Sequence, residues 1–258
     1  MNVLHFGIGL AIVFAASYAT AQVGADKRRS GTQDMGEALQ KMQDDDTANP
    51  GMLFVQLGSQ SWAKKAGAAD KSCADCHGNA GTSMKGVAAR YPAIPKGAEV
   101  PVDLEGRINL CRTENQKAER LPPESRELLA LQAYVAHQSR GMPIAPPADP
   151  RLVAFHDRGA EIYRARQGQI NLSCAICHDD NAGKKLAGVT IPEAHPTGYP
   201  IYRLEWQTLG SLKRRLRNCL VGIRAEPYAY DAPEYVMLAL FLMNRARGMM
   251  LESPGVRP

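Results

Sequence analysis

The stretch Cys174-Ala-Ile-Cys177-His178 decides how this chain of 258 residues is organised. Its pattern, Cys-x-x-Cys-His, is the attachment signature of c-type haem. Each cysteine sulfur forms a thioether to a vinyl group of the haem, and the histidine that follows reaches the iron from the same side. The sequence therefore predicts that Cys174 and Cys177 attach a haem and that His178 is an iron ligand.

A second copy of the signature, Cys73-Ala-Asp-Cys76-His77, lies 101 residues earlier in the chain. A single Cys-x-x-Cys can also be a redox dithiol or half of a zinc site. Here both copies carry the histidine, and the export signal described below fits haem attachment. We therefore predict two covalently bound haem c groups, with Cys73 and Cys76 attaching the other haem and His77 binding its iron.

The residues that precede the two motifs repeat as well. Gly58 and Trp62 stand fifteen and eleven residues before the first cysteine of one motif, and Gly159 and Tyr163 stand at the same distances before the other. A glycine and an aromatic residue on the helix that enters the haem motif resemble the first helix of class I cytochromes c. The resemblance implies that each of these helices packs closely against the last helix of its own repeat.

Apolar spacing predicts the first of these helices over residues 52–71. Leu53, Leu57, Trp62 and Ala66 are available to one face of it. We expect that face to be buried.

The last helix of the repeat is also visible twice, over residues 128–135 and 236–242. Each apolar run leads to a glycine, Gly141 or Gly248, that is suited to a helix C-cap. Together with the motifs, these runs predict a mainly α protein with two class I cytochrome c-like domains related by an internal repeat.

The repeat divides the chain into five expected segments. They are a signal peptide at 1–21, an N-terminal arm at 22–50, a cytochrome c-like domain at 51–142, a linker at 143–150 and a second cytochrome c-like domain at 151–258. The arm is polar and has few large apolar side chains, so we expect it to be extended or partly helical and to lie against another surface. The linker is assigned because it holds four prolines and little else of structural use.

The first 21 residues predict export. An apolar run from Gly7 to Ala16 is followed by Ala19-Thr20-Ala21, whose small first and third residues match a signal-peptidase site. The alternative, a retained membrane anchor, is disfavoured because the run is short for a spanning helix. Since c-type haems are attached outside the bacterial cytoplasm, we expect a periplasmic protein with no membrane span after signal removal.

Each haem iron needs a second axial ligand. Methionine is usual in cytochromes c, but Met84, Met142 and Met249 do not stand at a suitable place in their repeats. A cysteine does recur midway through each domain: Cys111 follows its motif histidine by 34 residues and Cys219 follows its own by 41. Their equivalent positions argue against a disulfide between them. We therefore predict a histidine and a cysteine thiolate on each iron.

The cysteine of the second domain stands in a basic segment at 213–224. On a helix, Arg215 and Cys219 share one face because they are four residues apart. A nearby arginine favours the thiolate form of a cysteine and offers a planar fork to a sulfate-like anion. Arg107 repeats the spacing before the other cysteine without the surrounding cluster. Either arginine can instead neutralise a haem propionate, yet the charge around Cys219 makes it the better candidate for chemistry.

Composition limits the classes of partner. Apolar residues make up 45% of the chain, enough for globular cores, and no stretch beyond the N-terminus is long enough to span a bilayer. The net charge of +5 is mild. No basic tract indicates nucleic acid binding.

Two Cys-x-x-Cys-His motifs, a midway cysteine in each domain and the run Arg-Asn-Cys-Leu-Val-Gly-Ile-Arg-Ala-Glu-Pro-Tyr at 217–228 resemble SoxA, the dihaem subunit of the SoxAX cytochrome of sulfur-oxidising bacteria. The resemblance covers nearly the whole mature chain. It implies an L-cysteine S-thiosulfotransferase, which oxidatively joins thiosulfate to a cysteine of the carrier protein SoxYZ while a monohaem SoxX subunit takes the electrons.

The resemblance also assigns roles to residues. It implies that Cys219 ligates its haem, carries a persulfide and is catalytic, and that Arg215 binds substrate. The haem of His77 and Cys111 is lost in some relatives, so its role is less defined. Two alternatives remain open at the level of sequence: a thiosulfate dehydrogenase that forms tetrathionate, and a dihaem cytochrome that only transfers electrons.

Overall fold

The computed structural model describes residues 26–258 together with Met1. The expected signal peptide therefore lies outside the described residues. The elements in chain order are α1 (Glu37–Asp44), α2 (Met52–Ala63), α3 (Cys73–His77), α4 (Ala80–Ser83), η1 (Ala88–Arg90), α5 (Leu104–Cys111), η2 (Arg112–Gln116), α6 (Arg126–His137), η3 (Pro150–Leu152), α7 (Val153–Arg164), α8 (Cys174–His178), β1 (Lys185–Leu186), β2 (Val189–Thr190), β3 (Ile201–Arg203), β4 (Thr208–Gly210), α9 (Leu212–Gly222), α10 (Pro233–Arg245) and β5 (Gly255–Arg257). Helices dominate, as the sequence predicts.

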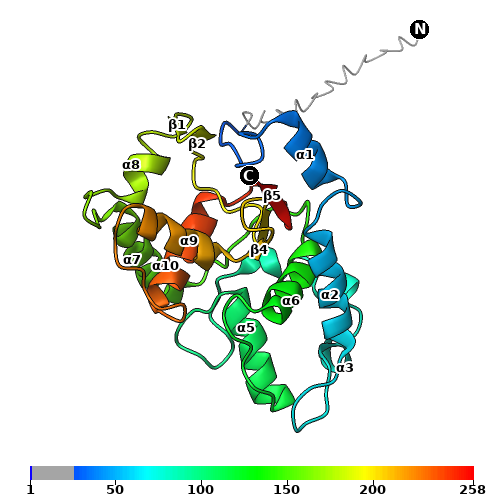
Figure 1. The fold of residues 1–258 in the computed structure, drawn as a ribbon. Helices are drawn as coiled ribbons and strands as arrows, with labels where there is room; N and C mark the ends of the chain where they lie inside the picture. Colours follow the sequence, from blue (N-terminus) through cyan, green and yellow to red (C-terminus); the bar gives the residue numbers. More distant parts are fainter. Residues whose placement is uncertain (2–25) are drawn as a thin grey trace.

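The internal repeat is present in three dimensions. Helix α2 packs on α6, and α7 packs on α10 (Figure 1). A glycine makes each crossing close: a Cβ added to Gly58 would lie 2.1 Å from the carbonyl oxygen of Ala130, and one added to Gly159 would lie 2.1 Å from that of Met237. Both distances are far below van der Waals contact, so only glycine fits. The expected packing of the first helix on the last is confirmed in both repeats.

Helix α2 differs from the expected helix in its last residue and in its buried face. Helix α2 ends at Ala63 rather than continuing to residue 71, and its Leu53 is 62% exposed. The buried face instead holds Val55, Gly58 and Trp62, because the close crossing at the glycine turns that side of the helix to the core.

The predicted glycine C-caps are also displaced. The C-cap residues of α6 and α10 are Gln138 and Ala246. Gly141 and Gly248 follow a few residues later with φ of 75° and 87°. In this left-handed conformation glycine is the favoured residue, so each glycine sets the turn after the helix rather than its end.

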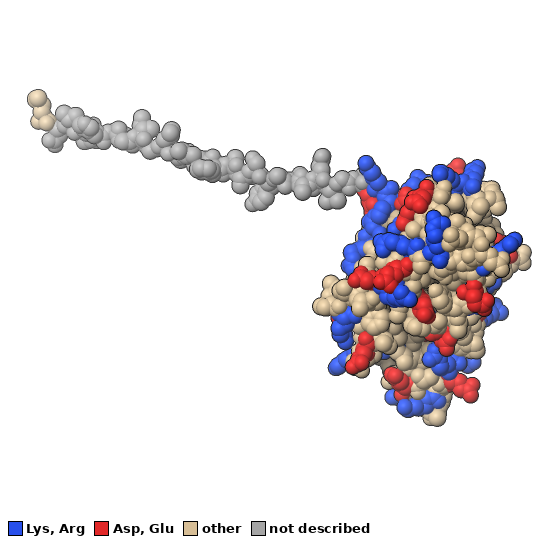
Figure 2. Space-filling view, turned by 90° about the vertical axis from the view of Figure 1, so that its left-hand side faces the viewer, with Lys and Arg blue, Asp and Glu red and all other residues tan. Residues whose placement is uncertain are grey.

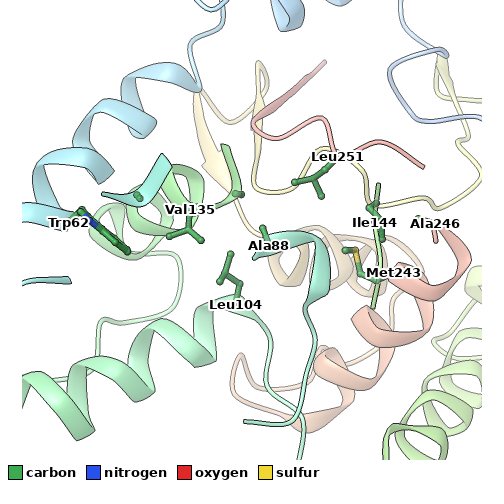
Figure 3. Packing of buried hydrophobic residues seen from close by; sticks show 10 residues of the cluster. Trp62, Ala88, Leu104, Val135, Ile144, Met243, Ala246 and Leu251 are labelled. Atoms are coloured by element: carbon green, nitrogen blue, oxygen red, sulfur yellow. The ribbon is translucent and has the colours of Figure 1, made fainter. Parts of the chain in front are cut away.

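One hydrophobic cluster is shared by the two repeats (Figure 3). Trp62 and Val135 come from the first repeat, and Met243 and Ala246 come from the second. Ile144, which lies in the segment expected to be only a linker, is fully buried between them. Its backbone N–H donates to Met249 and its carbonyl accepts from Gly248, so this segment is part of the core and not a loose connection.

A small sheet joins the end of the chain to the second repeat. Strand β3 pairs antiparallel with β4 and parallel with β5, with Tyr202 opposite Leu209 and Val256. The arm at 26–50 packs on this sheet through α1, where the buried Gln43 accepts a hydrogen bond of 3.0 Å from the backbone N–H of Val256. The surface on which the arm lies therefore belongs to its own chain.

No helix within residues 26–258 has the length and apolarity that crossing a membrane requires. On the face shown in Figure 2, basic and acidic side chains are interspersed and do not gather into a patch of one sign. This face therefore shows no basic tract of the kind that nucleic acid binding would need.

Candidate haem-binding active site

Helix α8 presents Cys174, Cys177 and His178 within five residues. Ser173 begins the helix by accepting a hydrogen bond of 3.2 Å from the backbone N–H of Ile176. At the other end, Asp179 accepts a bond of 2.9 Å from the Tyr163 hydroxyl. The aromatic residue found by the repeat thus fixes the helix that carries the haem motif.

The ring of His178 is oriented by the chain that follows it. Its Nδ1 lies 2.7 Å from the carbonyl oxygen of Pro192. A carbonyl can only accept, so Nδ1 carries the proton and Nε2 keeps its lone pair for a metal. Sequence reasoning missed Pro192, because it lies in an irregular segment with no periodicity.

Helix α9 brings Arg215 and Cys219 one turn apart on a single helix, as predicted. Ser211 caps it by accepting a bond of 3.1 Å from the backbone N–H of Arg214. Burial raises the pKa of Cys219, but the neighbouring His178 and the charges of Arg215 and Arg203 outweigh burial and leave that pKa below its usual value. The electrostatic setting therefore favours a thiolate.

A cavity of about 500 Å³ separates α8 from α9, and both His178 and Cys219 line it. Cavities of this size hold cofactors and drug-sized ligands. Cys174 and Cys177 would form the thioethers and His178 and Cys219 would be the iron ligands, a donor set that fits haem c. The structure brings His178 and Cys219 to one cavity, and Cys174 and Cys177 lie beside His178 on α8.

Three arginines line this cavity, and only one of them was found from the sequence. Arg203 and Arg257 stand opposite each other on β3 and β5. Both are already engaged: Arg203 pairs with Glu205 at 3.2 Å, and Arg257 pairs with Glu252 at 3.4 Å. Within residues 26–258 the side chain of Arg215 has no ion pair or hydrogen bond of its own, so its donors remain for an anion.

The first motif has the same scaffold. Ser72 and Asp75 form a reciprocal capping box at the start of α3, with hydrogen bonds of 3.0 and 2.8 Å. Trp62 donates a bond of 3.0 Å to the carbonyl of Gly78, the residue after His77. Trp62 and Tyr163 stand at equivalent positions of the repeat. Each donates a hydrogen bond to the residue that directly follows its motif histidine.

The side chains of the first site differ in two respects. His77 is exposed, and its ring packs beside Trp62 with centroids 5.7 Å apart. Cys111 ends α5, and burial raises its pKa more than the charge of Arg107 lowers it. All six cysteines are free, so the alternative disulfide between Cys111 and Cys219 is not formed. The first site has the haem donors but lacks the thiolate-favouring setting.

One further pair of residues completes the repeat. Gly67 and Gly168 precede the two motifs with φ of 67° and 71°. A Cβ at either position would lie within 2.1 Å of a backbone oxygen, that of Gln116 or Ile223. These oxygens follow the helices that carry Cys111 and Cys219, so the glycines let the motif loop approach the cysteine helix. Their identical spacing to the motifs was the available sequence signal.

Comparison with known proteins shows which domain family and which relatives this chain resembles. Residues 57–144 and 158–251 each match the SoxA/TsdA cytochrome c domain. The chain is 38% identical to the L-cysteine S-thiosulfotransferase subunit SoxA of Pseudaminobacter salicylatoxidans, over 83% of this chain and 75% of that protein. It is 34% identical to the subunit of the same name from Rhodovulum sulfidophilum, over 90% and 81%. The crystal structure of SoxXA from P. pantotrophus superimposes with a TM-score of 0.86 at 29% identity, covering 90% of this chain and 87% of that one.

Proposed function

This chain belongs to the SoxA family, and on that premise we propose that it is a periplasmic L-cysteine S-thiosulfotransferase subunit with two covalently bound haem c groups. The observation that carries the proposal is the pairing of Cys219 with Arg215 on α9, at a cavity that His178 lines from the other side. Family membership rests on both matched domains and on the relatives at 34% and 38% identity.

The proposed reaction joins thiosulfate to the thiol of a carrier-protein cysteine. The S–H bond of the carrier breaks, an S–S bond to the sulfane sulfur of thiosulfate forms, and one proton and two electrons leave. Haem c, when bound, supplies one-electron redox chemistry. A monohaem cytochrome of the SoxX type is the proposed electron acceptor, which accords with the likeness of this chain to the SoxXA structure. A SoxYZ-type protein is the proposed carrier.

We assign haem attachment, iron ligation, anion binding and catalysis to different residues of this chain. Cys174 and Cys177 would hold the haem beside the site, with His178 and Cys219 as iron ligands, and Cys73, Cys76, His77 and Cys111 would hold the other haem. Arg215 would bind the thiosulfate anion, because its guanidinium has two parallel donors and no partner within the described chain. Cys219 would be the catalytic residue and the bearer of a persulfide, since its surroundings favour the thiolate that a sulfur nucleophile needs.

Product analysis tests the proposed function. Purified protein is incubated with thiosulfate and an electron acceptor, with and without a SoxYZ-type carrier. A carrier whose mass increases by one thiosulfonate group is the expected result. Tetrathionate formed without the carrier would identify a thiosulfate dehydrogenase, and no sulfur product in either case would leave a cytochrome that only transfers electrons. Mass spectrometry of the peptide that contains Cys219 should show added sulfur.

The ligand set has its own test. A thiolate donates electron density and stabilises ferric iron, so both haems should be low-spin and hard to reduce. We expect ascorbate to leave them oxidised and dithionite to reduce them. A near-infrared band typical of methionine ligation would contradict the assignment of Cys111 and Cys219.

A further inference from the structure

We propose that Lys213, held between Asp103 and Glu105 of the first repeat, is a positioning residue that fixes helix α9 and so places Arg215 and Cys219 at the active site. This inference rests on the proposed function and deepens it. It gives the first repeat a task at the active site that does not depend on its own haem.

The contact is made by buried ionisable side chains from opposite halves of the chain. The Lys213 Nζ lies 2.6 Å from Oδ2 of Asp103 and 3.4 Å from Oε2 of Glu105. The three side chains are only 14%, 17% and 6% exposed. Charges this deeply buried are costly unless they are paired, and their pairing is geometrically demanding. The cluster therefore has one favourable arrangement, which is what a positioning contact requires.

A second polar contact lies beside the first. Ser211, the N-cap of α9, donates from its hydroxyl to Oε1 of Glu124 at 2.5 Å, and its backbone N–H donates to Oε2 at 3.3 Å. Glu124 has a φ of 59°, which non-glycine residues rarely adopt. Three carboxylates of the first repeat thus meet the first turn of α9, where the helix dipole also favours negative charge.

Apolar packing alone does not fix this helix. Leu220 is the one buried residue among the eleven of α9, at 6% exposure, and Leu216 is partly buried against the core of the second repeat. The middle of the helix is held by another polar contact, from the guanidinium of Arg217 to the carbonyl of Tyr228. Polar anchors therefore set the position and rotation of α9, and Lys213 is two residues from Arg215 on the same rigid element.

The cluster also lies close to the site itself. A cavity of about 70 Å³ between the repeats is lined by Lys213, Asp103 and Tyr199. Tyr199 lines the large cavity together with Arg215 and Cys219 as well. Asp103 is in addition the N-cap of α5, accepting 2.8 Å from the backbone N–H of Gly106. One carboxylate therefore ties together the starts of the two helices that carry Cys111 and Cys219.

The decisive variant is Lys213→Met, which keeps the length of the side chain and removes its charge. We expect turnover with thiosulfate and carrier to fall by roughly tenfold or more, since small misplacements of reacting groups have effects of this size. The electron paramagnetic resonance signal of the Cys219-ligated haem should become heterogeneous, that of the other haem should not, and amides of residues 212–222 should exchange faster. Lys213→Arg should restore most turnover. Lys64→Met, at an exposed lysine of the first repeat, is the matched control and should change nothing.

If Lys213→Met does not fold, the double variant Lys213→Met/Asp103→Asn also removes the carboxylate closest to the lost ammonium group. We expect it to fold and still to show the heterogeneous signal. A folded variant of either kind with wild-type turnover and a single sharp signal would overturn the proposal. The haem signal and the exchange rates are read without thiosulfate, so they test positioning even if the proposed conjugation activity is absent.

Discussion

The two haem motifs share a scaffold and differ in chemistry. Each follows a helix that crosses the last helix of its repeat at a glycine, and an aromatic residue of that first helix bonds to the residue just after each motif. At the second motif the histidine is half-buried and oriented by a backbone carbonyl, whereas at the first it is exposed. Burial leaves the Cys111 thiol with a raised pKa, whereas the surroundings of Cys219 lower its pKa. We therefore propose that the duplicated fold holds one reactive site, at Cys219, and one site, at Cys111, that has only the proposed haem ligands.

Matched variants of the two cysteines should show the largest difference in activity between the two sites. Cys219→Ala removes the proposed sulfur-bearing centre, so thiosulfate conjugation should fall by roughly 1,000-fold or more, the scale seen when a catalytic nucleophile is lost. Cys111→Ala should alter the spectrum of the first haem and spare most of the activity. The measurement is turnover with the carrier protein, with haem content as a check that Cys174 and Cys177 still attach their haem. Equal losses in both variants would show that the two sites are not divided in this way.

The arginines four residues before the two cysteines give the next largest contrast. Arg215→Ala removes the donor that has no partner within residues 26–258, and we expect turnover to drop by roughly 100-fold, a loss typical of a missing anion-stabilising group. Arg107→Ala should leave turnover within about twofold, because no basic cluster surrounds Cys111. Steady-state rates over a range of thiosulfate concentrations measure both. An Arg215→Ala enzyme with normal rates would instead assign Arg215 to a haem propionate.

The scaffold, in contrast to the sites, should respond symmetrically. Gly58→Ala and Gly159→Ala each place a Cβ 2.1 Å from a backbone oxygen of the facing helix. Overpacking of this kind costs about 1–3 kcal/mol in the free energy of unfolding, and more where the backbone must move. Denaturant unfolding should show similar losses for the two variants, with Gly36→Ala, where nothing lies within 4 Å, as the control. A loss confined to one glycine would show that the two crossings are not equivalent.

The sequence predicts the parts of this architecture that are local or repeated. The haem motifs are contiguous, the glycine and aromatic residues recur at a fixed spacing, and Arg215 and Cys219 need only one helical turn to meet. The repeat also allowed Cys111 to be predicted as an iron ligand, because it stands midway through its domain as Cys219 does, although no basic cluster surrounds it.

What the sequence could not predict depends on contacts between distant segments. Lys213 reaches Asp103 across 110 residues, and Arg203 joins the cavity only because β3 pairs with β5. The burial of Leu53 was predicted wrongly because apolar spacing identifies a face without the crossing point that decides whether it is buried. Ile144 was assigned to a linker because its proline-rich neighbours mask a side chain that fills the core between the repeats.

The smallest expected effect concerns the place where the two halves meet. The interface cluster has one cation, Lys213, and two close carboxylates, and Asp103 has the shorter contact.

Burial, reinforced by the charge of Asp103 and opposed by that of Lys213, raises the pKa of Glu105. An acid whose pKa is raised by folding holds its proton more tightly in the folded state, so its stabilising contribution is complete below the ordinary value of 4.5 and is lost as the pH rises towards the folded-state pKa. We therefore expect the stability of the wild type relative to Glu105→Gln to decline as the pH rises from 4.5 towards the folded-state pKa of about 8. Glu124, Tyr91, Tyr199 and Tyr235 also face this interface, but they are unchanged in the variant and cancel in the difference. Urea unfolding at a series of pH values measures the difference in free energy of unfolding between the wild type and Glu105→Gln. Glu114→Gln, at an exposed carboxylate of the same repeat, is the control. A pH-independent difference would mean that Glu105 is ionised and that Lys213 neutralises both carboxylates at once.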